Sequence, residues 1–151
     1  MVPTLERPEF DHIEQTFDQV EQLDQTAVVV EHTLPEQAHE IQSVMRSMLS
    51  HVPPVGVTTA SKLLAVDRKT VDSWAEQGLL VEAETPSSRR GFDPLRLHQV
   101  RHVVRQLRAA GRTRHLSDAI WFHLEDQAVL EREDVQEGLR QLHAGEVVEA
   151  Y

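Results

Sequence analysis

Basic and hydroxyl side chains cluster in the middle of this sequence, in the pattern most suited to binding chemistry. Several follow Asp67 directly, where they would occupy the exposed side of a short helix. Cationic and hydroxyl groups in such a place can donate hydrogen bonds to phosphate oxygens and to the edges of bases. The candidate contact residues are Lys62, Arg68, Lys69, Thr70, Ser73, Arg89 and Arg90.

The charge distribution favours the same part of the chain. The 151 residues have a formal net charge of −10, but residues 55–115 hold eleven basic and six acidic groups. Residues 1–54 hold ten acidic and two basic groups, and residues 116–151 hold nine acidic and two basic groups. A polyanion would be attracted by the middle and repelled by both ends. We therefore expect the ends to self-associate or to bind another protein.

Other kinds of chemistry find less support. His98 and His102 are spaced so that one helix face could present two metal ligands, but the sequence shows no third ligand, so no metal site is expected. The chain contains no cysteine, which excludes disulfides and thiolate ligands. It also lacks a glycine-rich phosphate loop and a nucleophile motif. We therefore expect neither an enzyme nor a cofactor.

Two short helices around a tight turn would position the central basic residues. The first is predicted over Thr59–Leu64 and the second over Arg68–Gln77, with Asp67 as the N-cap and Gly78 at the end. Trp74 is predicted to be a core residue. This arrangement predicts a helix-turn-helix whose second helix faces the major groove of DNA. The alternative is a three-helix packing unit that contacts only protein.

A hairpin and a longer helix are predicted next. The turn-forming residues around Pro86 indicate a hairpin tip that carries Arg89 and Arg90. A helix should follow from about Pro94 to Ala110. It carries a stripe of arginines that could contact DNA or the acidic flank of the protein itself: Arg101, Arg105 and Arg108.

The flanking segments are predicted from their apolar patterns. A helix over Glu9–Leu23, a strand over Thr26–Glu31 and a helix over Pro35–Leu49 should precede the basic region. After it, Ser117 should cap a helix that reaches about Leu130, and a final helix over Arg132–His143 should lead into an acidic tail.

The expected fold is therefore mainly α, with a winged helix-turn-helix at its centre. Residues 1–54 would form an acidic helix-strand-helix extension for dimerisation or partner binding. Residues 55–115 would form the DNA-binding domain, and residues 116–151 an acidic helical tail for partner binding. No apolar run is long enough to cross a membrane, and the start of the chain does not resemble a signal peptide. A cytoplasmic location is expected.

The central run VTTASKLLAVDRKTVDSWAEQGLL, followed by RRGFDPLRLHQVRHVVRQLRAAGRTRHLSDAI, resembles the DNA-binding domain of MerR-type and excisionase-type regulators. In that family the helix-turn-helix precedes an arginine-bearing wing with a glycine–aromatic pair, here Gly91-Phe92. Two further helices follow, separated by a glycine, here Gly111. The resemblance implies DNA contact through Arg68, Lys69, Thr70, Arg89 and Arg90, with Lys62 at a phosphate.

The flanks resemble those of bacterial antitoxins. This resemblance implies a homodimeric repressor that binds double-stranded DNA at its own operator and neutralises an RNase toxin, often of the PIN-domain type. The acidic tail would cover the basic cleft of that toxin. The alternatives are a stand-alone DNA-binding or DNA-bending factor of the excisionase or MerR type, and an adaptor whose helix-turn-helix no longer touches DNA.

Overall fold

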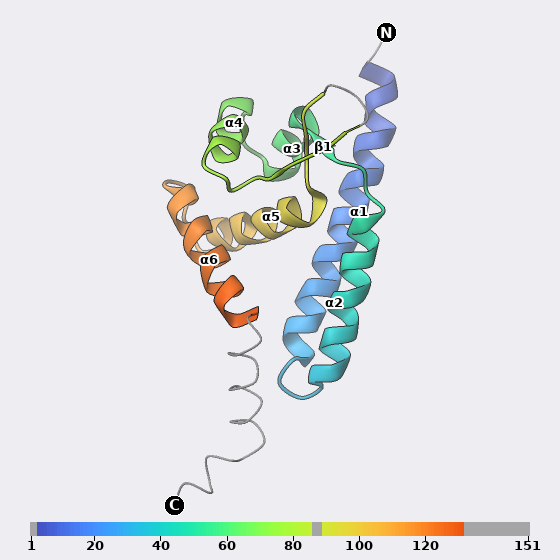
Figure 1. Cartoon of the computed structure of the whole chain (residues 1–151), viewed down its shortest axis with the longest axis vertical. Helices are drawn as coiled ribbons and strands as arrows, with labels where there is room; N and C mark the ends of the chain where they lie inside the picture. The colour runs from blue at the N-terminus through green and yellow to red at the C-terminus, as the bar shows by residue number, and fades with distance from the viewer. Residues whose placement is uncertain (1–2, 86–88, 132–151) are drawn as a thin grey trace, which may run out of the picture.

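The computed structural model describes residues 3–85 and 89–131. Within these ranges the protein is mainly helical, with a small three-stranded antiparallel sheet (Figure 1). None of the described helices is long and apolar enough to cross a membrane. The elements are α1 (Pro3–Val30), α2 (Pro35–Ser50), β1 (Val55–Gly56), α3 (Val57–Leu64), α4 (Arg68–Glu76), β2 (Glu82–Ala83), β3 (Gly91–Phe92), α5 (Pro94–Ala109) and α6 (Leu116–Glu131).

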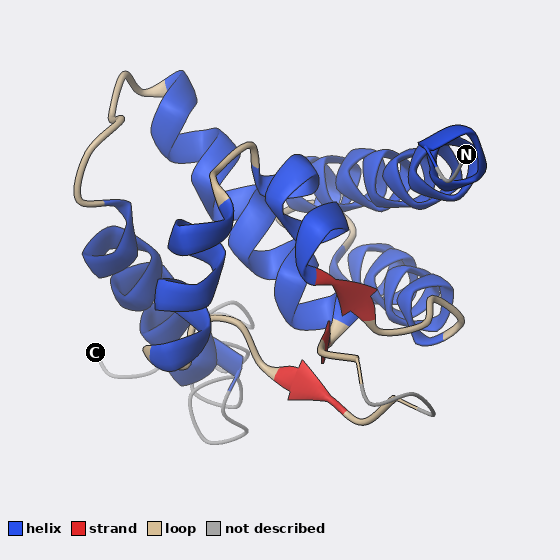
Figure 2. Cartoon of the chain, turned by 90° about the horizontal axis from the view of Figure 1, so that it is seen from above, coloured by secondary structure: helices blue, strands red, loops and turns tan. Residues whose placement is uncertain are grey.

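Helices α1 and α2 form an antiparallel hairpin along one side of the molecule (Figures 1 and 2). The predicted second helix is confirmed, with a proline in its first turn as expected. The apolar stripes of the two helices face each other and continue the core into the rest of the protein. Their buried members are Phe17, Val20, Ala27, Ala38, Met45 and Leu49.

The predicted strand over Thr26–Glu31 is wrong, because α1 continues through Val30. Successive valines favour a strand locally. However, Ala27 falls on the apolar stripe of the helix and is buried against the hairpin, while Val28 and Val29 are exposed. Packing of the stripe outweighs the local preference. The N-terminal extension is thus a helical hairpin, and its first helix begins well before the predicted Glu9.

The two central helices are confirmed with small shifts of their ends. Helix α3 begins at Val57, before the predicted start, and α4 ends at Glu76 with Gln77 as its C-cap. The turn between them requires Ala65 to adopt a left-handed conformation with φ of 54°. Gly78 has φ of 81°, as expected for a glycine just beyond a helix. Trp74 is buried in the core as predicted.

The sheet joins the segment before α3 to the hairpin after α4. Strand β3 is central and pairs with β1 on one side and β2 on the other. Phe92 faces Val55 in one pairing and Glu82 in the other. The antiparallel β2–β3 pair agrees with the predicted hairpin, whose tip at residues 86–88 lies outside the described residues.

Helix α5 crosses the centre of the molecule, between the hairpin and α6 (Figure 1). Its apolar side is fully buried at Leu97 and Val100, as the sequence predicts. Gly111, with φ of 86°, turns the chain toward α6. Helix α6 begins at Leu116, so Ser117 lies inside its first turn and is not the predicted cap. The predicted helix over Arg132–His143 and the residues after it lie outside the described residues.

Candidate nucleic-acid interface

Helix α4 presents its first turn to solvent. The Asp67 Oδ1 atom accepts hydrogen bonds from the Thr70 backbone N–H at 2.8 Å and from the Thr70 hydroxyl at 2.6 Å. These hydrogen bonds hold the pKa of Asp67 below its usual value. The cap thus fixes the start of the helix and occupies the hydroxyl of Thr70, which the sequence assigned to DNA contact.

The two cations beside this cap donate no side-chain hydrogen bond to the described residues, although the charge of Lys69 also contributes to the lowered pKa of Asp67. Arg68 and Lys69 are both exposed, and neither forms an ion pair there. Ser73, one turn further along, is exposed, and its Oγ accepts a hydrogen bond of 3.0 Å from Gln77 Nε2. Four of the predicted contact residues therefore lie together on α4, and its two cations are available to an anion.

The arginines of the hairpin differ from each other. The guanidinium of Arg90 donates to Glu82 of β2 and, at 2.7 Å, to Asp72 of α4. Arg90 therefore connects the hairpin to α4. The exposed side chain of Arg89 has no such partner among the described residues. Arg89 is thus the better placed of the two for an external phosphate.

Lys62 lies on α3 with its amine 5.1 Å from the centre of the Phe10 ring of α1. The residue is exposed, so the amine can still reach a ligand in solvent. The contact with an aromatic ring is weakly attractive for an exposed cation. Lys62 therefore faces α1 as well as solvent, which the sequence did not indicate.

A groove runs along α4 beside the connection between α5 and α6. Lys69, Thr70 and Ser73 line it on the α4 side, and Thr113 and His115 line it from the connection. Arg114 lies between those two residues and is exposed. The sequence analysis missed Arg114, although the basic run after Gly111 could have indicated it.

The arginine stripe of α5 is used inside the protein. Arg101 donates to Asp18 of α1 at 2.8 Å and to the Leu63 carbonyl at 3.2 Å, and it is only 2 % exposed. Arg105 also donates to Asp18, at 3.5 Å. Arg108 donates to the Leu64 and Ala65 carbonyls at 2.8 and 2.9 Å. The sequence left open whether this stripe contacts DNA or the acidic flank of the protein. Arg101 and Arg105 contact the acidic flank, at Asp18.

The histidines of α5 face the same acidic side of α1. His102 Nδ1 donates to Glu21 Oε1 at 2.7 Å, and this hydrogen bond raises the pKa of His102. Burial alone would raise the pKa values of Glu21 and Asp24. The hydrogen bonds and positive charge of the facing imidazoles outweigh burial, so both carboxyl pKa values lie below the usual range.

The candidate interface therefore consists of the α4 surface, the groove beside it and Arg89 of the hairpin, which the neighbouring Arg90 connects to Asp72 of α4. The chain matches no protein-family model, no curated protein and no solved structure.

Proposed function

We propose that residues 55–115 form a winged helix-turn-helix that binds double-stranded DNA, with α4 in the major groove. The observation that carries this proposal is the pairing pattern of the cations. Arg101 and Arg105 of α5 are paired with the protein's own acidic groups, whereas Arg68 and Lys69 of α4 are exposed and have no ion-pair partner among the described residues. A duplex offers closely spaced phosphates to such cations.

The neighbouring elements support the same orientation. Helix α3 packs against α4 and would cross the DNA backbone, where Lys62 can approach a phosphate. The β2–β3 hairpin is held against α4 through Arg90 and Asp72, so it acts as the wing. Arg89 on that wing and Arg114 beside the groove would contact phosphates on either side of α4.

The direct test is DNA binding by the full chain across a salt series. The probes are a fluorescent duplex from upstream of its own gene and a shuffled duplex of equal length. We expect saturable binding to the upstream duplex that weakens steeply as salt rises. Lys69→Ala and Arg68→Ala should each weaken binding by about 1–3 kcal/mol if they contact base edges. If they contact only phosphates, each should lower the salt slope by about one.

Arg46→Ala provides a control with the same loss of charge. Arg46 is exposed on α2, which lies across the molecule from α4 (Figure 1). This variant should bind the duplex as the unaltered protein does. Equal losses in the Arg46 and Lys69 variants would mean that binding follows net charge and not α4. Absence of binding at low salt would contradict the proposal.

We further propose that the protein acts as a transcriptional regulator, most simply as a homodimer on paired half-sites. The antitoxin role, the toxin partner and the stand-alone excisionase-type alternative remain predictions from the sequence. The acidic tail on which the antitoxin role depends lies largely outside the described residues.

A further inference from the structure

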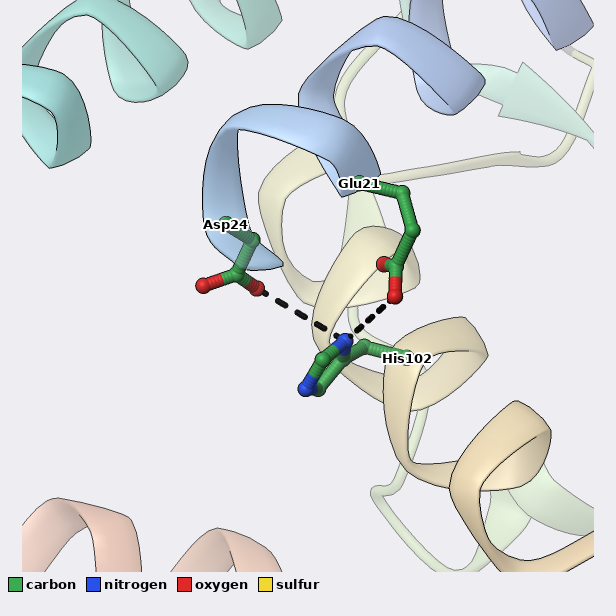
Figure 3. Close-up of side chains that lie close together, drawn as sticks. All are labelled: Glu21, Asp24 and His102. Atoms are coloured by element: carbon green, nitrogen blue, oxygen red, sulfur yellow. Dashed lines mark hydrogen bonds and ion pairs between the residues drawn. The ribbon is translucent and has the colours of Figure 1, made fainter. Parts of the chain in front are cut away.

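Two pairs of potential metal ligands face each other where α1 meets α5. Glu21 and Asp24 are three positions apart on α1, and His98 and His102 are four positions apart on α5. Both spacings place the two side chains on one face of a helix. The packing of α1 on α5 brings the two faces together, and Figure 3 shows Glu21, Asp24 and His102 pointing toward one another.

The distances are close to those of a coordination shell. His102 Nδ1 is 2.7 Å from Glu21 Oε1 and 3.7 Å from Asp24 Oδ2. His98 Nε2 is 3.1 Å from the same Asp24 oxygen. Ligand atoms about 2.0–2.2 Å from a tetrahedral ion lie about 3.3–3.6 Å apart. The observed separations fall on both sides of that value, so small side-chain adjustments would admit an ion.

Burial indicates that the cluster needs a further partner. Glu21 is only 5 % exposed, and its Oε2 atom accepts no hydrogen bond from the described residues. Figure 3 shows this second oxygen on the side of Glu21 that faces Asp24. A buried carboxylate oxygen without a partner is unfavourable. The side chains of Asp24 and His102 are 22 % and 20 % exposed, which leaves a route from solvent.

We propose that Glu21, Asp24 and His102 bind one divalent transition-metal ion of the zinc class. His98 Nε2, 3.1 Å from Asp24 Oδ2, would orient that carboxylate from behind. Imidazole nitrogens and carboxylate oxygens are ligands that zinc accepts in tetrahedral sites. Two carboxylates balance the charge of the ion when both histidines are neutral. The ion would join the N-terminal hairpin to α5. This proposal does not depend on DNA binding.

The test is metal binding by the untagged full chain after treatment with a chelator. Co²⁺ is the first probe, because its visible absorption reports tetrahedral coordination, and Zn²⁺ is then used in competition. We expect one ion per chain and a Co²⁺ spectrum that Zn²⁺ abolishes. His102→Gln and Glu21→Gln should each weaken Zn²⁺ binding at least about 10-fold, since even residues behind the ligands have effects of that size.

His39→Gln is the matched control for the histidine variant, because His39 is exposed on α2. Circular dichroism reports whether each variant is folded. A titration of the unaltered chain tests the site even if a variant does not fold. In histidine-ring NMR, the first equivalent of Zn²⁺ should shift His98 and His102 before His39. Lack of saturable binding, equal affinity in the His39 and His102 variants, or earlier loading of other histidines would overturn the proposal.

Discussion

Gly91 lies in the central strand β3, where other parts of the chain approach the backbone closely. A β-carbon added at this position would lie 2.7 Å from the Pro54 Cβ and 2.8 Å from the Thr85 Cγ2. Both distances are well inside van der Waals contact. Glycine is therefore required at position 91 for steric reasons, because Pro54 and Thr85 leave no room for a side chain.

Replacement of Gly91 by alanine should lower the free energy of unfolding by about 1–3 kcal/mol, because the sheet must move to admit a methyl group. The control is Gly56→Ala, since a β-carbon there meets no atom within 4 Å. The control should change stability by less than about 1 kcal/mol. Urea denaturation of both variants provides the measurement. Equal stabilities would contradict the steric explanation.

At the scale of single elements, the sequence predicts what local pattern determines. The helix over Pro35–Leu49, the Asp67 cap and the helix that begins at Pro94 follow from apolar spacing and capping residues, and the structure confirms them. The prediction of a strand over Thr26–Glu31 is wrong, because the conformation of this segment depends on packing against α2. The local sequence pattern does not contain that information.

The same limit applies to the candidate sites. The exposed cations of α4 follow from local spacing, because their neighbours lie on the same helix. The partners of Arg90 and Arg101 cannot be predicted from local spacing, since Asp72 and Asp18 are distant from them in the sequence. His98 and His102 can be recognised as a pair, but only the tertiary structure supplies Glu21 and Asp24.

The cap of α4 gives a prediction for pH. The pKa of Asp67 is lowered from 3.8 by the hydrogen bonds from Thr70. A lowered carboxyl pKa contributes stability above the unfolded-state pKa, and that contribution is lost as the pH falls through the folded-state value. Asp67→Asn removes the titration. The difference in free energy of unfolding, unaltered protein minus variant, should be constant above about pH 5. It should fall as the pH drops below about 4, because only the unaltered protein loses the contribution of the ionised Asp67.

The measurement is the free energy of unfolding of both proteins in urea from pH 6 to pH 2.5. Taking the difference between the two proteins removes the titration of the groups that they share. A difference that does not change with pH would mean that the charge of Asp67 does not contribute to the cap.

At the scale of the whole molecule, the acidic N-terminal hairpin lies beside the basic central region. Asp18, Glu21 and Asp24 form one face of α1, and they meet the arginines and histidines of α5. This pairing neutralises one basic face of the protein and leaves the cations of α4 available. The acidic charges of α1 thus form an internal contact with the basic residues of α5, and the basic residues of α4 form an external surface.

Removal of one charge at this contact should weaken the attachment of the hairpin. Asp18→Asn leaves the guanidinium of Arg101, which is 2 % exposed, without its charged partner. Loss of a partner from a fully buried pair costs about 3–5 kcal/mol. Because Asp18 itself is 48 % exposed, water can replace part of the interaction, and we expect a loss of about 1–2 kcal/mol in the free energy of unfolding.

The matched control is Asp11→Asn, the same change at an exposed position of the same helix. It should alter stability by less than about 0.5 kcal/mol. Urea denaturation separates the two variants, and hydrogen exchange locates the effect, since protection should fall first in α1 and α2. If both variants are equally stable, the Asp18–Arg101 pair does not hold the hairpin on α5, and apolar burial alone joins the two parts.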